Sequence, residues 1–344
     1  MNRQEEIDKV YKCGKHLVIL GAGATLAATL RNPEKNGKQL PLMKNIVDVV
    51  GLNDIVNTLP QSIKILKNDF EKMYSALYEL TDFREELDII ETKVYDYFND
   101  LELPQKPNIY DYLILSLRYK KDTIATFNWD PFLYQAYNRN AKFVKSPGII
   151  FLHGTVALGY DKNDGSSGPA GWHSKKTLGY FEPVRLLYPV TNKDYNSDKF
   201  IKSQWDAVTR CLKKSQRVTI FGYSAPKSDV EAISLFQKAW GSVDDRNMEE
   251  FELIDVREKL EVKDSWKTFI HTHHYTFHNS FFSCSIAEHP RRSVESYIHW
   301  AMPTTEDEAF QEGNPVPENF ESLEQMWEWY NPLIEAEKKM GLLD

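Results

Sequence analysis

The stretch HLVILGAGAT at 16–25 constrains the fold of this chain more than any other. An apolar, β-branched run leads directly into a turn that contains Gly21 and Gly23, and small residues follow the turn. Such a strand, turn and helix open a nucleotide-binding α/β unit, because glycine lets the backbone approach a pyrophosphate and the helix points its positive end at it. The GxGxxG pattern is incomplete, since position 26 is leucine. A tight turn that binds nothing is therefore the alternative.

Four later segments repeat the strand signal. They are short, apolar and β-branched, as central strands of a parallel sheet are, and they lie at 123–126, 149–152, 218–221 and 251–254. Between the first two strands, the apolar residues of 40–120 recur at helical spacing and are interrupted by turn signals. We predict an α/β fold: a Rossmann-like parallel sheet flanked by helices, with a helical insertion at 40–120 after the first strand.

Three other segments complete the expected organisation. The stretch between His153 and Trp205 is rich in glycine, proline and serine and is too long for a plain connection, so we expect a lid or a mobile loop there. Residues 205–215 are expected to form a helix that packs on the sheet. The end of the chain is helical on both sides of a proline- and acid-rich bridge. We predict a catalytic domain at 1–290 and a helical C-terminal tail at 291–344.

Composition and charge exclude several classes of protein. The net charge of −8 argues against a protein that coats nucleic acid by charge, and we expect no direct sequence-specific nucleic-acid binding. The chain has 3 cysteines and no CxxC pair, which is typical of a reducing compartment. No apolar run reaches the roughly 18 residues of a membrane-spanning helix, and the first residues do not resemble a signal peptide. We predict a cytoplasmic protein with no membrane partner.

Polar side chains stand directly after the second predicted strand. The sequence there is TFNWD, in which Asn128 and Asp130 alternate with Phe127 and Trp129, so that the two polar side chains are expected to share one direction. Ligands of open parallel sheets bind at the carboxyl ends of the strands, which makes Asn128 and Asp130 candidate site residues. The alternative for Asp130 is a helix cap, because Pro131 favours the first helical position. Both roles can hold together.

A histidine follows the third predicted strand. His153 lies in FLHGT, directly before Gly154. An imidazole titrates near neutral pH and can take a proton from a water molecule or a ribose hydroxyl. His153 is therefore a candidate general base, and a hydrogen-bonded core histidine is the alternative.

Two later strand ends carry further candidates. In FGYSAP, Gly222 permits a close approach of the backbone, and the Ser224 hydroxyl can bind phosphate or ribose. Asp229 is expected to cap the helix that follows. In ELIDV, Asp255 is placed to bind ribose hydroxyls. A solvated acid after an edge strand is an equally good interpretation of Asp255.

The segment HTHHYTFH supplies His271, His273, His274 and His278. In a strand, His271 and His273 share a face, which can suit zinc or copper. The cluster contains no cysteine or acidic residue, so exposed strand histidines are the favoured interpretation and we expect no metal. No serine lies on a GxSxG turn, which argues against nucleophilic catalysis by a Ser-His-Asp triad.

Taken in order, GAGAT, the helical insertion, TFNWD, LHG, GYS and LIDV resemble the sirtuin-like NAD-binding domain, over about residues 16–256. The phrase YSAPKSD and the tryptophan-containing helix before it look like the bacterial branch associated with defence against phage. There are two departures. Deacylating sirtuins carry Gln-Asn-x-Asp, whereas this chain has Phe127 at the first position. The four-cysteine zinc ribbon of those enzymes has no counterpart here, because the chain has no CxxC.

The resemblance implies an NAD⁺ glycohydrolase that forms ADP-ribose and nicotinamide, with NAD as substrate and no metal. By the residue match, Asn128 would bind the nicotinamide ribose or the attacking water, Asp130 would hold the local geometry, and His153 would be the general base. The cofactor-binding residues that the match implies are Gly21, Ala22, Gly23, Thr25, Gly222, Tyr223, Ser224 and Asp255.

The resemblance also implies how the activity would be controlled in the cell. An enzyme that depletes the NAD of an infected cell is expected to be held inactive until it assembles. We therefore expect a homo-oligomer, or docking on an ATPase, a nucleic-acid-guided protein or a sensor of phage components.

A non-catalytic NAD or ADP-ribose sensor would keep the glycine turn but would not need His153. Phe127 and the missing zinc ribbon disfavour a protein deacylase, and the long helical insertion disfavours a dehydrogenase.

Overall fold

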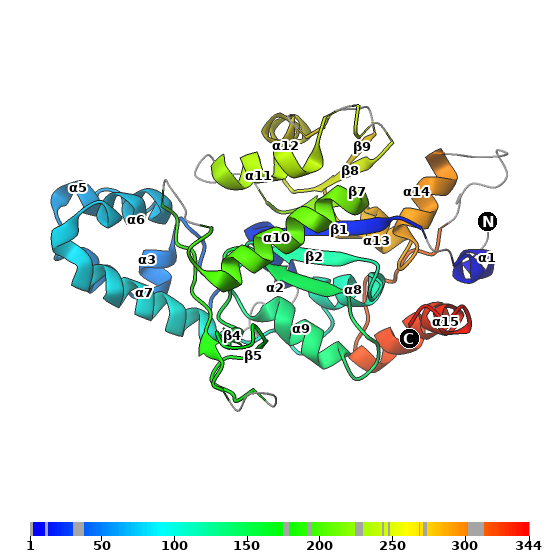
Figure 1. Ribbon diagram of the computed structural model, residues 1–344, viewed down its shortest axis with the longest axis horizontal. Coiled ribbons are helices and arrows are strands. Elements are labelled where there is room, and N and C mark those ends of the chain that lie inside the picture. Colours follow the sequence, from blue (N-terminus) through cyan, green and yellow to red (C-terminus); the bar gives the residue numbers. More distant parts are fainter. Residues whose placement is uncertain are drawn as a thin grey trace.

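A six-stranded parallel sheet forms the centre of the molecule (Figure 1). The strands lie in the order β3-β2-β1-β7-β8-β9, and each neighbouring pair is parallel. Their bounds are Lys15–Leu20 for β1, Thr123–Thr126 for β2, Gly148–Phe151 for β3, Ser215–Phe221 for β7, Glu250–Ile254 for β8 and Tyr275–His278 for β9. The five predicted strands are confirmed as β1, β2, β3, β7 and β8.

The computed structural model describes most of the chain. The described residues are 3–10, 13–29, 38–174, 179–190, 195–223, 230–242, 244–246, 248–267, 269–270, 274–301 and 313–343. Ser224, Asp229, His271 and His273, which the sequence singled out, lie outside them.

Helices cover both faces of the sheet, as a central parallel sheet requires. In β1, Leu17 and Ile19 face one core and Val18 and Leu20 face the other, because side chains alternate along a strand. The first core is completed by α10 (Lys199–Lys214), α11 (Val230–Trp240) and α12 (Lys259–Trp266). The second is completed by α2 (Ala22–Thr29), α8 (Ile109–Ser116), α9 (Phe132–Asn140) and α13 (Ser285–Glu288).

The predicted helix at 205–215 is confirmed as α10, but it begins earlier than its sequence pattern indicated. Asp198 sets the start, because its carboxylate accepts a hydrogen bond from the Ile201 N–H at 3.0 Å. This is an N-cap, which satisfies one of the backbone donors at the start of the helix.

The predicted helical insertion lies between β1 and β2. After α2 it contains α3 (Ile46–Val50), α4 (Asn53–Val56), α5 (Gln61–Lys64), α6 (Phe70–Tyr78), a 3₁₀ turn at Thr81–Phe83, α7 (Arg84–Asn99) and α8. Figure 1 shows α3, α5, α6 and α7 grouped as a lobe beside the sheet. A capping box starts α8 and returns the chain to the sheet: the Asn108 side chain caps the first turn, and the Asp111 carboxylate accepts from the Asn108 N–H at 2.9 Å.

The long segment after β3, expected as a lid or a mobile loop, contains secondary structure of its own. A small antiparallel sheet in the order β5-β4-β6 forms from Leu158–Tyr160 (β4), Ser167–Pro169 (β5) and Glu182–Pro183 (β6). Its carboxyl-terminal part, which includes Leu187 and Pro189, returns to the main body.

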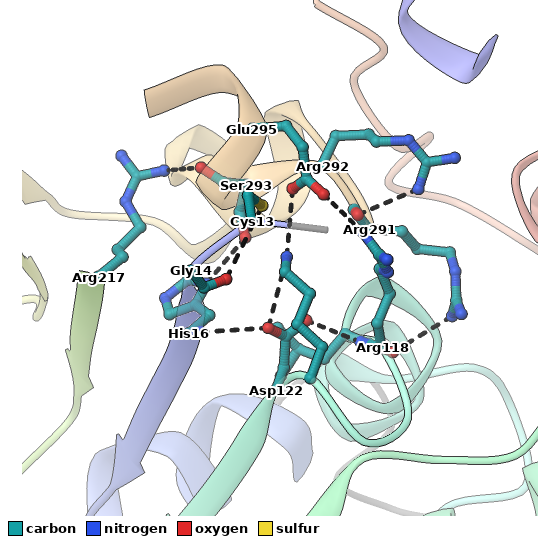
Figure 2. Close-up of polar contacts among 12 residues, drawn as sticks. Cys13, Gly14, His16, Arg118, Asp122, Arg217, Arg291, Arg292, Ser293 and Glu295 are labelled. Carbon is teal, nitrogen blue, oxygen red and sulfur yellow. Dashed lines mark hydrogen bonds and ion pairs between the residues drawn. The ribbon is translucent and has the colours of Figure 1, made fainter. Parts of the chain in front are cut away.

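The end of the chain contains a 3₁₀ turn at Phe281–Ser283, α14 (Ser293–Ala301) and α15 (Leu323–Lys339), and α15 packs against α1 (Arg3–Asp8). Buried ion pairs hold it to the amino-terminal side of the sheet (Figure 2). Arg118 and Lys121, which precede β2, contact the Glu295 carboxylate at 2.5 and 3.2 Å. A second buried carboxylate in this region, Glu337, contacts Arg291 and Arg292.

Candidate functional site

A pocket of about 200 Å³ opens at the carboxyl ends of β1, β2, β3 and β7. Gly21, Asn128, His153 and Gly222 follow these four strands, and all four line the pocket. A parallel sheet brings them together because the carboxyl ends of its strands meet at one edge. The helical insertion closes the other side with residues 40–43, Glu71 and Phe98, none of which the sequence singled out.

Asn128 and Asp130 point in the same direction, as their alternation with Phe127 and Trp129 predicted, because both contact the Thr25 hydroxyl. The Asn128 Nδ2 donates to the Gly21 carbonyl oxygen and to Thr25 Oγ1, each at 2.8 Å. The Thr25 hydroxyl donates in turn to Asp130 Oδ2 at 2.8 Å. A carbonyl oxygen only accepts hydrogen bonds, so the amide nitrogen must face Gly21. The Asn128 carbonyl oxygen therefore remains for the pocket that this residue lines.

Tyr110 completes this hydrogen-bond network, and the sequence analysis missed it. Its hydroxyl lies 2.5 Å from Thr25 Oγ1 and 3.4 Å from Asn128 Nδ2. Because the proton of Thr25 goes to Asp130, Tyr110 is the donor to Thr25. Burial, and then the nearby Asp130 carboxylate, raise the pKa of Tyr110, so that its hydroxyl keeps its proton. The only signal in the sequence was a tyrosine in the first turn of an apolar helix, which is ordinary for a core residue.

Both carboxylate oxygens of Asp130 accept hydrogen bonds. Its Oδ1 accepts from the N–H of Phe132 at 3.1 Å, and its Oδ2 accepts from the Thr25 hydroxyl. The helix α9 begins at Phe132, so Pro131 is its N-cap and not, as expected, its first helical residue. Burial raises the pKa of Asp130 to about 6, although the hydrogen bonds from Thr25 and Phe132 oppose this rise. Asp130 therefore fixes the position of Thr25 and, through Thr25, the amide of Asn128.

The raised pKa of Asp130 predicts how stability depends on pH. The folded protein holds this proton up to about pH 6, whereas the unfolded chain releases it near 3.8. The contribution of Asp130 to stability is therefore complete below the unfolded pKa and is lost as the pH rises through the folded one. The parent should lose about 3 kcal/mol in free energy of unfolding through this group as the pH rises from about 4 to 7. Asp130→Asn, which has no proton to release, should not show this loss. Denaturant unfolding of both proteins across this range checks it, and a pH-independent difference would contradict it.

His153 borders the same pocket as Asn128. It is 7% exposed, and its ring lies edge-on to Phe127 with the ring centroids 4.7 Å apart. The Tyr195 ring lies nearly parallel to the His153 ring, with the ring centroids 6.2 Å apart. The burial of His153 is compatible with the alternative of a core histidine, but its ring also forms part of the pocket wall. The two candidate catalytic side chains thus come from neighbouring strands and meet at one cavity.

Aromatic rings form much of the pocket wall. Phe127 stacks on Tyr223 with centroids 4.1 Å apart and an interplanar angle of 12°. Trp129 packs edge-on to Phe98 and also contacts Tyr188. Trp129 is therefore a core residue that shares in lining the pocket.

Gly21 and Gly23, which follow β1, pack against Gly222, which follows β7. A Cβ added to Gly21 would lie 2.5 Å from the Gly222 carbonyl oxygen, and one added to Gly23 would lie 2.8 Å from the Gly222 Cα. Gly222 itself has φ +60, a conformation that favours glycine. The Gly23 N–H donates to the Gly222 carbonyl oxygen at 2.9 Å. Close packing of two turns thus requires these glycines, and pyrophosphate binding by Gly21, Ala22, Gly23 and Thr25 stays a prediction.

Asp255 does not line the pocket with Asn128. It borders a second pocket of about 410 Å³, which also includes Gly23 and shares Gly222 with the first. Its carboxylate is bound by Arg257, whose guanidinium lies 2.7 Å away. Burial opposes ionisation of Asp255, but the hydrogen bonds and charge of Arg257 lower its pKa. The structure therefore places Tyr223 at the first pocket and Asp255 at the second.

The described part of the histidine cluster makes contacts within the protein. His278 lies 3.4 Å from the Glu252 carboxylate, and His274 lies 2.9 Å from the Tyr297 hydroxyl. Among the described residues, no group of three or more histidine, cysteine or acidic side chains is arranged to hold a metal ion. Among the same residues, no helix is both long and apolar enough to span a bilayer.

No protein-family model matches the chain, and no curated protein matches it. Solved structures of Sir2 and sirtuin proteins are similar to it at low identity. A Sir2 homologue in complex with NAD is 13% identical; the match covers 87% of this chain and 94% of that one, with a TM-score of 0.36. A Sir2 complex with a p53 peptide and NAD⁺ is also 13% identical, covers 85% and 95%, and has a TM-score of 0.38. A structure on the basis of sirtuin substrate affinity is 14% identical, covers 86% and 99%, and has a TM-score of 0.40. The chain is thus similar to these structures over most of its length, while the chemistry of its site rests on its own residues.

Proposed function

We propose that the protein is an NAD⁺ glycohydrolase that breaks the bond between nicotinamide and ribose. One observation carries the proposal: Asn128 and His153, from the ends of β2 and β3, line one pocket at the carboxyl edge of a parallel sheet. An amide can hold a ribose hydroxyl or a water molecule, and an imidazole can take the proton of that water.

The charge of the pocket also supports a cationic substrate group. The described residues that line it include the carboxylates of Glu71 and Asp130 and four aromatic rings, but no lysine or arginine. The nicotinamide ring of NAD⁺ is a flat cation, which aromatic faces and carboxylates attract. The pyrophosphate is expected beside Gly222, which borders both this pocket and the adjoining one. The adjoining pocket, which shares Gly222, would receive the adenosine half.

The proposed reaction is a substitution at the anomeric carbon. The bond between this carbon and the nicotinamide nitrogen breaks, and its electron pair stays with the ring, which leaves as neutral nicotinamide. Positive charge then develops on the ribose. Water adds to the anomeric carbon and gives its proton to His153, so that the products are ADP-ribose, nicotinamide and a proton. The Asn128 carbonyl oxygen would accept a hydrogen bond from the ribose or the water and so fix the position of attack.

The test is release of nicotinamide from NAD⁺ by the purified chain, with ADP-ribose quantified by chromatography. We expect the two products in equal amounts. His153→Gln keeps the size of the side chain but removes the base, so the rate should fall by about 10²–10⁴-fold. The matched control is His299→Gln on α14, which lies outside the pocket and should keep the parent rate.

Two results would count against the proposal. A His153→Gln variant as active as the parent would show that His153 is not the base. A parent that binds NAD⁺ but releases no nicotinamide would favour the non-catalytic sensor.

We infer the cellular role from the resemblance of the motifs: a bacterial anti-phage effector that depletes NAD. Assembly into a homo-oligomer, or docking on a partner of the defence system, would control an activity that harms the host cell. Size-exclusion chromatography with light scattering, combined with the NAD⁺ assay on each fraction, tests this. Equal specific activity in monomeric and assembled fractions would contradict control by assembly.

A further inference from the structure

We propose that Tyr110 is a positioning residue for the proposed reaction, and that the C-terminal tail at 291–344 holds it in place through α8. The inference rests on the proposed function. The Tyr110 hydroxyl contacts Thr25, and Thr25 contacts the amide of Asn128, which lines the pocket. The proposal therefore links a segment outside the predicted catalytic domain to the position of a catalytic side chain.

The Thr25 hydroxyl is the centre of the hydrogen-bond network behind Asn128. Its oxygen accepts from Asn128 Nδ2 at 2.8 Å and from the Tyr110 hydroxyl at 2.5 Å. Its proton goes to Asp130 Oδ2 at 2.8 Å. A hydroxyl has one proton and two lone pairs, so these three contacts use all that Thr25 can offer. Without the Tyr110 hydroxyl one lone pair would be empty, and Thr25 would hold the Asn128 amide less firmly.

The tail binds the carboxyl-terminal end of α8, the helix that carries Tyr110. Arg291 Nη1 donates to the carbonyl oxygens of Leu115 and Leu117, at 2.8 and 3.2 Å. The Arg291 N–H donates to the Ser116 carbonyl oxygen at 2.6 Å. The hydroxyls of Ser116 and Tyr330 lie 2.6 Å apart. The last carbonyl groups of a helix have no partner within it, so the tail provides the cap of α8.

The tail also reaches the first turn of α8, beside Tyr110. Trp327 Nε1 donates to Asn140 Oδ1 at 2.7 Å, and Asn140 Nδ2 donates to Asp111 Oδ1 at 2.8 Å. The other oxygen of Asp111 accepts from the Asn108 N–H at 2.9 Å and so completes the capping box. Two hydrogen bonds thus connect Trp327 of the tail to the residue that follows Tyr110.

These contacts make α8 a support that is fixed at both ends. All eight of its residues are buried, so the helix cannot shift without moving its neighbours. A change in the tail should therefore change the position of Tyr110, and through Thr25 that of the Asn128 amide. Exact placement of reacting groups lowers the barrier of the chemical step. We expect a weaker hold on Tyr110 to lower kcat and to change KM little.

The first experiment compares Tyr110→Phe with the parent in the full chain, by the rate of nicotinamide release from NAD⁺. Phenylalanine keeps the buried ring and removes only the hydroxyl, so kcat should fall about tenfold, while KM should stay within about threefold. The matched control is Tyr297→Phe on α14. It also loses a buried hydrogen bond, to the Met248 carbonyl oxygen at 2.8 Å, but lies outside the pocket and should keep the parent kcat.

The second experiment tests the link from the tail. Trp327→Phe keeps an aromatic ring beside Phe143 but removes the donor to Asn140, so kcat should fall about fivefold. The matched control is Trp240→Phe on α11, which loses an indole hydrogen bond to the Phe269 carbonyl oxygen at 3.2 Å and should keep the parent kcat.

The double variant of Tyr110→Phe and Trp327→Phe separates this link from a general loss of stability. If the tail acts through Tyr110, the double variant should lose about tenfold in kcat, because the hydroxyl that Trp327 helps to place is already absent. Independent effects would multiply to about fiftyfold, and this result would overturn the link. Circular dichroism and denaturant unfolding show that each variant is folded at the assay temperature.

Other outcomes would also decide against the proposal. A Tyr110→Phe variant with the parent kcat would overturn the role of Tyr110 and leave the proposed function intact. An equal loss of kcat in Tyr297→Phe would show that any buried hydrogen bond has this effect, and so would overturn a specific role. A parent that releases no nicotinamide would overturn both proposals together.

Discussion

Asn128→Ala is expected to lower the rate of nicotinamide release by about 10³-fold, because it removes the polar group that fixes the reacting atoms. The amide nitrogen of Asn128 is held by the Gly21 carbonyl and the Thr25 hydroxyl, each at 2.8 Å. Two fixed hydrogen bonds leave the amide one orientation, with its oxygen toward the pocket. Alanine offers neither the oxygen nor the two donors.

Stability measurements separate this effect from unfolding. The loss of a donor to the Gly21 carbonyl should cost about 1–3 kcal/mol, which a folded domain of this size tolerates. Circular dichroism should therefore match the parent at a temperature where the rate is measured. The control is Asn138→Ala, an exposed asparagine on α9, and it should keep the parent rate. An Asn128→Ala variant within threefold of the parent would contradict the role of the amide.

Glu337→Ala is expected to lower the free energy of unfolding by about 3–5 kcal/mol, because it leaves buried positive charges without their partner. Glu337 is fully buried in α15. Its Oε1 accepts from Arg291 Nε at 2.8 Å and from Arg292 at 2.6 Å, and its Oε2 accepts from Arg291 at 2.5 Å. Burial opposes its ionisation, but the two arginines lower its pKa to about 2.

Denaturant unfolding at neutral pH checks this second prediction. Glu335→Ala is the matched control, because its exposed pairing with Lys338 at 2.6 Å should contribute no more than about 1 kcal/mol. The contribution of Glu337 is present above the pKa of an ordinary glutamate and is lost as the pH falls toward its folded pKa. The difference between parent and Glu337→Ala should therefore shrink in acid. If the parent and Glu337→Ala had equal free energies of unfolding at pH 7, the buried network would not be needed for stability.

The elements of the sheet were predictable because their signals are local. The runs that became β1, β2, β3, β7 and β8 are short, apolar and β-branched, and strands that are buried on both faces need such residues. Asn128, Asp130 and His153 were predictable as site candidates for a related reason. Polar residues directly after a buried strand can only stand at its end, and parallel strands share that edge.

Other features depended on contacts between distant segments. Tyr110 and Glu71 lie in helices of the insertion, where a tyrosine or a glutamate is ordinary, and only the return of these helices to the sheet edge brings them to the site. The glycine pattern was also ambiguous. Gly21 and Gly23 resemble a phosphate-binding turn, but their first requirement is the close approach of Gly222.

By itself, the sequence determined which segments become strands and helices and which polar residues end those strands, because hydrophobic periodicity and turn chemistry act over a few neighbouring residues. The tertiary structure alone decided the strand order, which places β2 and β3 side by side and so brings Asn128 and His153 to one pocket. It also decided which carboxylate is buried against arginine, as Glu337 is, and which borders the pocket, as Glu71 does. The physical reason is that burial and electrostatic pairing depend on residues that are far apart in the chain, and only the packed fold brings them together.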